Sequence, residues 1–201
     1  QEIMCNELKE SFEDEFENLV TTFTAFNGRD GIKIFEDNDS IDLVIIDIKN
    51  KINAKSPQNK RAGSMIAEKI KASPKFQINS APIKFISGFE EFIEDYTDYG
   101  LTDSANVYDK SDRGINNLIQ DVRELIKDPN HRMTHSIRQE FKSELNFTTK
   151  QITPEFTVQL ISIICMIRAE SGNKPTILSE LRTNFQRLLD ELTKLPDFQP
   201  N

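Results

Sequence analysis

The sequence predicts an α/β protein in which a parallel sheet layered with helices is followed by an all-helical part. From residue 19 to about 127, short segments rich in β-branched residues alternate with segments of helical periodicity. This alternation is typical of parallel strands joined by crossover helices. Beyond residue 128 the strand signals end and only amphipathic segments follow. We therefore predict two domains, 1–127 and 128–201.

Composition narrows the class of protein. The chain has 201 residues, of which 37% are hydrophobic and 29% charged, as in soluble globular proteins. Its net charge of −8 argues against sequence-independent binding to nucleic acid. Two cysteines, Cys5 and Cys165, are too few for a disulfide framework, and no apolar run is long enough for a membrane span. We expect a cytoplasmic protein without a membrane anchor.

The N-terminal segments are predicted in the order helix, strand, helix and strand. Residues 3–18 carry apolar side chains about four apart, as an amphipathic helix requires. Residues 19–26 are rich in β-formers and end at an Asn-Gly turn signal, and 29–37 have helical spacing. The stretch 41–50, IDLVIIDIKN, is too short for a membrane span and too β-branched for a typical helix. We predict a strand over 42–48, buried on both faces.

The next elements continue the alternation as far as residue 128. A polar stretch without apolar periodicity, 49–61, is predicted to be an exposed loop. The elements predicted after it are, in order, a helix over 62–72, a strand over 83–87, an acidic helix over 89–100, a strand over 105–110 and a helix over 115–128.

The C-terminal part is predicted to be a small helical unit. Its amphipathic segments are 131–146, 154–170 and 176–193. Residues 156–167, FTVQLISIICMI, are apolar almost all round, which favours either the central helix of a core or a face for a partner or a second copy of the chain. Residues 128–201 hold nine basic and nine acidic side chains, so protein binding is favoured over DNA binding.

Three predicted strands end in reactive side chains: Asp47, Ser87 and Lys110. The carboxyl ends of parallel strands lie along one edge of a sheet, and ligands bind there. A carboxylate can act as the nucleophile toward a phosphoryl group, while an ammonium and a hydroxyl contact the phosphoryl oxygens. The structural alternative for Asp47 is a carboxylate that caps the following turn.

The sequence resembles the receiver domain of two-component response regulators over roughly residues 1–127. The segments that carry the resemblance are NGRDGIKIF, DLVIIDI, AGSMIAEKIKA, PIKFISG and VYDKS. The resemblance implies a flavodoxin-like, doubly wound, five-stranded parallel sheet in the order 2-1-3-4-5. It also implies a phosphorelay signalling protein rather than an enzyme, with Asp47 as phospho-acceptor, Ser87 as switch hydroxyl and Lys110 as phosphate contact. The implied partners are a histidine kinase or phosphotransfer protein and a downstream protein.

The resemblance further implies Mg²⁺, held by Asp47, by the backbone carbonyl of Lys49 and by two acids at the end of the family's first strand. Here the first predicted helix starts almost at residue 1, so that strand and its acids are not expected in the sequence, and Glu2 is the only acid nearby. The chain also begins with Gln1 and not Met, as a fragment of a longer protein would. Magnesium binding is thus expected if residues before Gln1 supply the acids. Other departures are the long loop after Asp47 and Ser111 in place of the family's frequent proline.

Other interpretations remain at this stage. One is a degenerate pseudo-receiver that binds partners without phosphorylation. Another is a phosphohydrolase with an aspartate nucleophile, which is disfavoured because it usually needs a second carboxylate where Lys49 stands. His131 and His135, one helical turn apart, could bind a metal but have no third ligand in the motif, so surface histidines are the better interpretation. The basic residues of the loop are interpreted as a solvated surface or, second, as a phosphate or partner patch: Lys49, Lys51, Lys55, Lys60 and Arg61.

Overall fold

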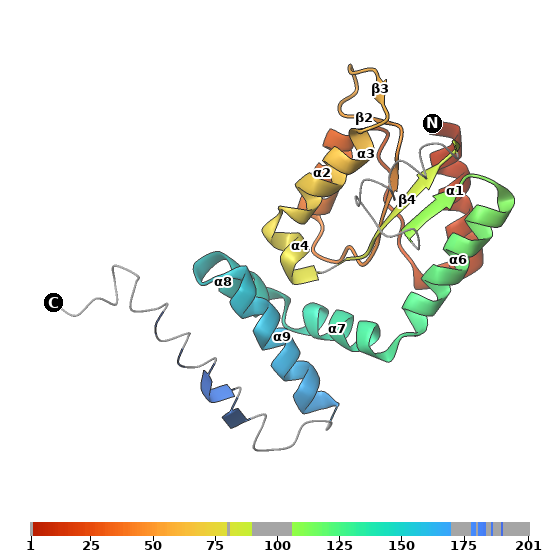
Figure 1. Ribbon diagram of the computed structural model, residues 1–201. Coiled ribbons are helices and arrows are strands. Elements are labelled where there is room, and N and C mark those ends of the chain that lie inside the picture. The colour runs from red at the N-terminus through yellow and green to blue at the C-terminus, as the bar shows by residue number, and fades with distance from the viewer. Residues whose placement is uncertain are drawn as a thin grey trace. The chain divides into compact units, whose positions relative to one another are not determined.

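The computed structural model describes residues 2–79, 81–89 and 106–169, together with 178, 179, 181–183, 186 and 190. Contacts divide the chain into two compact units. The first consists of Gln1–Phe76 and Ser80–Glu124, and the second of Gln77–Asn79 and Leu125–Asn201. The first is a mixed α/β unit and the second is helical where described (Figure 1).

A three-stranded parallel sheet forms the centre of the first unit. Its strands are β1 (Val44–Asp47), β4 (Ile83–Ser87) and β5 (Val107–Asp109), in the order β1-β4-β5. Ile46 pairs with Phe85, and Phe85 pairs with Val107. The predicted α/β class, these three strands and their parallel direction are confirmed.

The predicted strand over 19–26 is not formed. Residues 17–19 make a single 3₁₀ turn, and 20–25 carry neither helix nor strand. An extended segment becomes a strand only when a neighbour supplies the ladder of hydrogen bonds, and the described residues give 20–25 no such neighbour. The described sheet therefore has three strands, where the resemblance implied five.

Helices cover both faces of this sheet. Figure 1 shows α2 (Gly28–Asp37) and α3 (Ala62–Lys71) on one face, with α1 (Glu2–Phe16) and α6 (Asp112–Lys127) on the other. A short helix, α4 (Pro74–Asn79), precedes β4. The predicted helices over 3–18, 29–37, 62–72 and 115–128 are thus confirmed with small shifts at their ends. The predicted helix over 89–100 lies outside the described residues, apart from Phe89.

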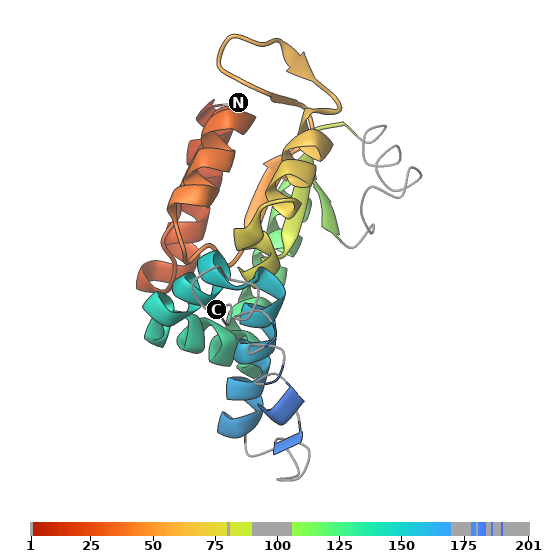
Figure 2. The same ribbon diagram turned by 90° about the vertical axis from the view of Figure 1, so that its left-hand side faces the viewer.

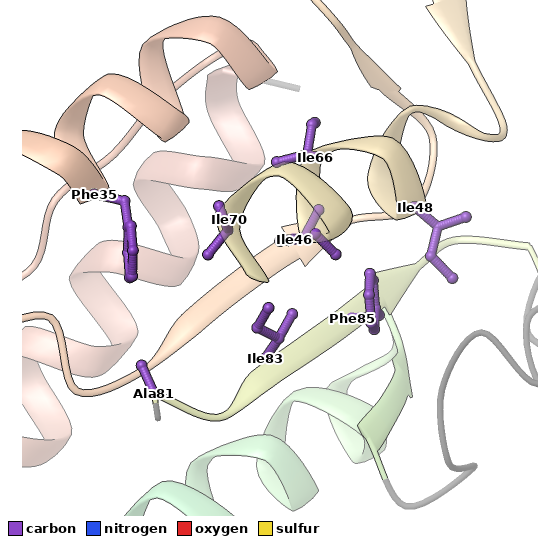
Figure 3. Packing of buried hydrophobic residues seen from close by; sticks show 9 residues of the cluster. Phe35, Ile46, Ile48, Ile66, Ile70, Ala81, Ile83 and Phe85 are labelled. Carbon is purple, nitrogen blue, oxygen red and sulfur yellow. The ribbon is translucent and has the colours of Figure 1, made fainter. Parts of the chain in front are cut away.

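An apolar cluster joins the sheet to α2 and α3. Figure 3 shows Phe35 of α2 and Ile66 and Ile70 of α3 against Ile46 and Phe85 of the strands. All five side chains are buried. A Cβ on Gly63 would lie 2.9 Å from Cα of Ile48, so the absence of a side chain lets the first turn of α3 approach the end of β1. This packing fixes the carboxyl end of β1.

The predicted loop over 49–61 contains a short antiparallel hairpin. Its strands are β2 (Asn50–Lys51) and β3 (Gln58–Asn59), with Asn50 paired to Asn59. Figure 2 shows it projecting beyond the end of the parallel sheet. The prediction of an exposed segment is confirmed for 53–55 and 57–61. The prediction that the segment is a loop without regular structure is wrong.

The second unit contains three described helices: α7 (Pro129–Glu140), α8 (Lys142–Gln151) and α9 (Pro154–Arg168). Side chains of Asp128 and Thr153 accept hydrogen bonds from the first turns of α7 and α9, as N-caps do. The core is formed by Ile137, Leu145 and Ile161. The predicted helical character of this part is confirmed.

One detail of the C-terminal prediction differs from the structure. The segment 131–146 falls in two helices, because the chain leaves helical geometry at Phe141, where φ is −106° and ψ is 28°. The segment 176–193 lies mostly outside the described residues. No helix of the described part is long and apolar enough to cross a membrane.

Candidate functional site at the carboxyl edge of the sheet

Asp47 is the last residue of β1, and both of its carboxylate oxygens accept hydrogen bonds. Oδ2 lies 2.6 Å from Nζ of Lys110, and Oδ1 accepts a bond of 3.2 Å from the backbone N–H of Lys49. The two charged side chains are largely covered, with 12% of Asp47 and 21% of Lys110 exposed. A largely buried ion pair is costly to separate, so the two groups hold each other at this edge.

The strand ladder brings Lys110 to Asp47. Backbone N–H of Ile48 donates to the carbonyl of Ile86, and that of Lys110 donates to the carbonyl of Ser87, each at 2.9 Å. The three strands are therefore hydrogen-bonded up to their carboxyl ends. The prediction that Asp47 and Lys110 share one edge agrees with this geometry.

Ser87 lies on the middle strand, but its hydroxyl bonds to its own loop. Oγ accepts a hydrogen bond from the N–H of Phe89 and donates one to the Phe89 carbonyl, both at 3.1 Å. The side chain is 1% exposed. Ser87 thus ends the strand that lies between β1 and β5, and the hydrogen bonds of its side chain are local.

Phe89 belongs to this edge although the sequence did not single it out. Nζ of Lys49 lies 4.8 Å from the centre of the Phe89 ring, a cation–π arrangement. Register could have indicated this pair: Asp47 pairs with Ile86, so positions just beyond the two strand ends are neighbours. The aliphatic stem of Lys110 also passes this loop, since a Cβ on Gly88 would lie 3.5 Å from its Cδ.

A second carboxylate at the edge, Asp109, has a structural role. Its Oδ1 accepts hydrogen bonds from the hydroxyl of Ser111 and, at 2.8 Å, from the Ser111 N–H. These bonds lower the pKa of Asp109 below its usual value. Oγ of Ser111 in turn accepts from the N–H of Gly114 at 3.2 Å. Asp109 and Ser111, which stands where the family often has proline, thus order the first turn of α6.

The described residues do not form a magnesium site by themselves. Mg²⁺ is usually bound by one or two carboxylates with water and phosphate oxygens. Asp47 has both oxygens engaged, and the side chain of Glu2 is outside the described part. Among the described residues no group of three or more His, Cys, Asp or Glu side chains could hold a metal ion, His131 and His135 included. The metal roles of Asp47, Glu2 and the Lys49 carbonyl stay predictions.

The face of the sheet that α6 covers carries a separate polar cluster. Nζ of Lys84 lies 2.9 Å from the hydroxyl of Tyr108 and 3.1 Å from Oδ2 of Asp121, and Tyr108 donates to the same Asp121 oxygen. Burial raises the pKa of Tyr108, and the bond to Asp121 raises it further. Burial alone would lower the pKa of Lys84, but its bonds to Tyr108 and Asp121 outweigh that effect and raise it. Burial alone would raise the pKa of Asp121, but the hydrogen bonds that it accepts from Tyr108 and Lys84 outweigh that effect and lower it.

Comparison with known proteins adds no relative: the chain matches no protein-family model, no curated protein and no solved structure. A carboxylate beside an ammonium, at the ligand-binding edge of a parallel sheet, can accept an electrophile on oxygen while the cation neutralises the added charge.

Proposed function

We propose that the first unit is a receiver-like signalling module that accepts a phosphoryl group on Asp47. The observation that supports this most directly is the 2.6 Å pair of Lys110 Nζ and Asp47 Oδ2 at the carboxyl edge of the sheet. Ser87 ends the strand between them, in the order that the receiver resemblance implies. The receiver fold itself, with strands beyond the three described, is part of this proposal.

The proposed reaction is a phosphoryl transfer. An oxygen of Asp47 attacks the phosphorus of a donor, an O–P bond forms, and the donor's P–N or P–O bond breaks with its electron pair leaving on the donor. Lys110 is close enough to move from the carboxylate to a phosphoryl oxygen. Ser87 could reach the phosphoryl group only after giving up its bonds to Phe89. That exchange would alter the loop after β4 and transmit the added charge.

In this proposal the protein transmits a signal and does not turn over a substrate. Its donor is a histidine kinase or phosphotransfer protein in the cytoplasm, and its output is a contact with a downstream protein or a second copy of the chain. Residues 128–201 carry no net positive charge, which disfavours DNA as their ligand. The C-terminal helices would therefore supply or regulate the contact with a protein.

The test is incubation of the full chain with acetyl phosphate and Mg²⁺, followed by intact-mass measurement and mapping of the modified residue. We expect one phosphoryl group on the wild-type protein and none on Asp47→Asn. Asp109→Asn is the matched control, because it removes a carboxylate from the same edge that lies outside the Asp47–Lys110 pair. Modification that persists in Asp47→Asn would refute the proposal.

The degenerate pseudo-receiver is the second candidate, and a specific observation favours it. Both Asp47 oxygens and the Ser87 hydroxyl already have intramolecular partners, and the described residues contain no group of three or more His, Cys, Asp or Glu side chains that could hold a metal ion. If the wild-type chain takes up no phosphoryl group and shows no NMR shifts near Asp47 and Ser87 with beryllofluoride and Mg²⁺, this candidate is favoured. Unchanged biological output in Asp47→Ala would then support a binding platform.

A further inference from the structure

A groove of about 510 Å³ lies between α2 and α3 beside the β2–β3 hairpin, and neither Asp47 nor Lys110 lines it. Its apolar lining consists of Ile32 from α2, Met65 and Ile66 from α3, and Ile52 from the hairpin. Met65 is 41% exposed, so a large apolar side chain faces solvent here. An exposed apolar strip within a polar rim is typical of an interaction site.

The groove is built on a well-packed base. A Cβ on Gly28 would lie 2.5 Å from Cγ1 of Ile66, so only a residue without a side chain allows α2 to start this close to α3. The backbone N–H of Arg29 donates to the carbonyl of Ile52 at 2.8 Å, which ties α2 to the hairpin. The groove is therefore present before any partner binds, which lowers the cost of binding.

Cations flank the apolar strip on both sides. Arg29 and Lys33, one helical turn apart, lie on α2, and Lys69 lies on α3 one turn after Met65. All three are exposed, and Glu36 is the one acid of the lining. In a chain of net charge −8, none of these three cations has an ion-pair partner in the described part.

We propose that this groove binds an acidic amphipathic helix of a partner protein. Two neighbouring helices form a trough that a third helix can enter with its apolar stripe down, a common mode of recognition. Acids on both edges of that helix would then meet Arg29 and Lys33 on one side and Lys69 on the other. This inference does not depend on phosphorylation of Asp47.

The lining favours a helix over a small anion. Small-molecule sites usually orient their ligand with a few polar groups in a largely enclosed pocket. Here the charged groups are exposed and sit on long, flexible stems along the rim. Such charges attract and align an acidic surface more than they fix a single phosphate.

The test uses fluorescence anisotropy with the full chain and a panel of labelled acidic peptides of about 14 residues, roughly 21 Å long as helices. The peptides place leucine at helical spacing with glutamate on both flanks, and differ in the register of the leucines. A scrambled peptide of identical composition is the control. We expect the amphipathic peptides to bind, and their affinity to fall about tenfold or more when salt is raised from low to high concentration.

The variants separate the groove from general electrostatics. The triple reversal Arg29→Glu, Lys33→Glu and Lys69→Glu should weaken binding about tenfold or more. Lys69→Glu alone should weaken it more than Lys71→Glu, since Lys71 is exposed in the same last turn of α3 but does not line the groove. Met65→Gln tests the apolar strip and should also weaken binding. Circular dichroism verifies that each variant is folded.

Several results would overturn the inference. They are failure of every amphipathic peptide to bind the wild-type chain, equal binding of the scrambled peptide, and equal effects of Lys69→Glu and Lys71→Glu. Full displacement of the peptide by millimolar inorganic phosphate would also overturn it, because it would identify a site for a small anion.

Discussion

Tyr108 donates its hydroxyl hydrogen to Asp121 and links the third strand of the sheet to the helix that covers it. The same hydroxyl lies 2.9 Å from Nζ of Lys84, on the central strand. Tyr108 is buried, whereas Val107, one residue earlier, is partly buried and packs against the apolar cluster that joins the sheet to α2 and α3. The side chains of these two neighbouring residues thus lie on opposite faces of β5, and that of Tyr108 lies on the face covered by α6.

Tyr108→Phe should lower the free energy of unfolding by about 1 kcal/mol, the usual worth of a hydrogen bond. Asp121 is 45% exposed, so water can replace part of what is lost and a larger effect is not expected. Urea denaturation of the wild type, Tyr108→Phe, Asp121→Asn and the double variant gives the coupling between the two residues. Additive effects in this cycle would show that the contact contributes nothing to stability.

The raised pKa of Tyr108 predicts a loss of stability at alkaline pH. In the unfolded chain the hydroxyl loses its proton near the ordinary pKa of 10.0, while in the folded chain it keeps the proton to higher pH. Above pH 10 the folded state therefore binds more protons than the unfolded state, and the free energy of unfolding falls as pH rises. The stability difference between wild type and Tyr108→Phe should be constant from neutral pH up to about pH 10 and shrink above it. A difference that grows above pH 10 in urea titrations would contradict the sign of the shift.

Breaking the Asp47–Lys110 ion pair should cost more stability than removing the Tyr108 hydroxyl. Lys110→Met leaves a carboxylate that is 12% exposed without its cation, so we expect a loss of about 2 kcal/mol in the free energy of unfolding. Adding Asp47→Asn should recover part of that loss, since a neutral amide is cheaper to bury than an unpaired charge. Lys60→Met, at an exposed position in the long loop, is the comparison and should change little. The argument fails if Lys110→Met is as stable as Lys60→Met.

Much of the edge could be predicted because strand ends are readable in sequence. The β-branched runs ending at Asp47 and Ser87 predict strands, and parallel strands bring their carboxyl ends together. The direction of the Ser87 hydroxyl could not be predicted, because the backbone of Phe89 sets it. The contact of Phe89 with Lys49 was not predicted, because the two residues lie forty positions apart in sequence. Only the register of β1 against β4 brings them together.

Two features of the fold depend on tertiary packing and could not be predicted from hydrophobic periodicity. The apolar spacing of 131–146 continues through the break at Phe141, so local propensity gives no reason to divide the segment. In the structure Ile137 and Leu145, on the two sides of the break, join Ile161 in one core. Likewise, 20–25 has the composition of a strand, but the described residues provide no partner for its backbone.

The last prediction concerns the close approach of α6 to the end of β5. A Cβ on Gly114 would overlap the backbone oxygen of Asp109 and lie 2.8 Å from its Cγ. Alanine normally favours a helix over glycine by about 1 kcal/mol. Here the overlap involves backbone, which cannot rotate away, so Gly114→Ala should lower the free energy of unfolding by about 2 kcal/mol despite that preference.

Gly31→Ala is the matched control within the same unit. Gly31 is also helical, in α2, but a Cβ there would lie 3.5 Å from Cβ of Ala25, an ordinary contact. The gain in helix propensity should therefore prevail, and Gly31→Ala should raise the free energy of unfolding by about 0.5–1 kcal/mol. Opposite signs for the two substitutions in urea denaturation would show that Gly114 is required by the contact with Asp109. If Gly114→Ala stabilises the protein as Gly31→Ala does, α6 does not pack this closely against β5.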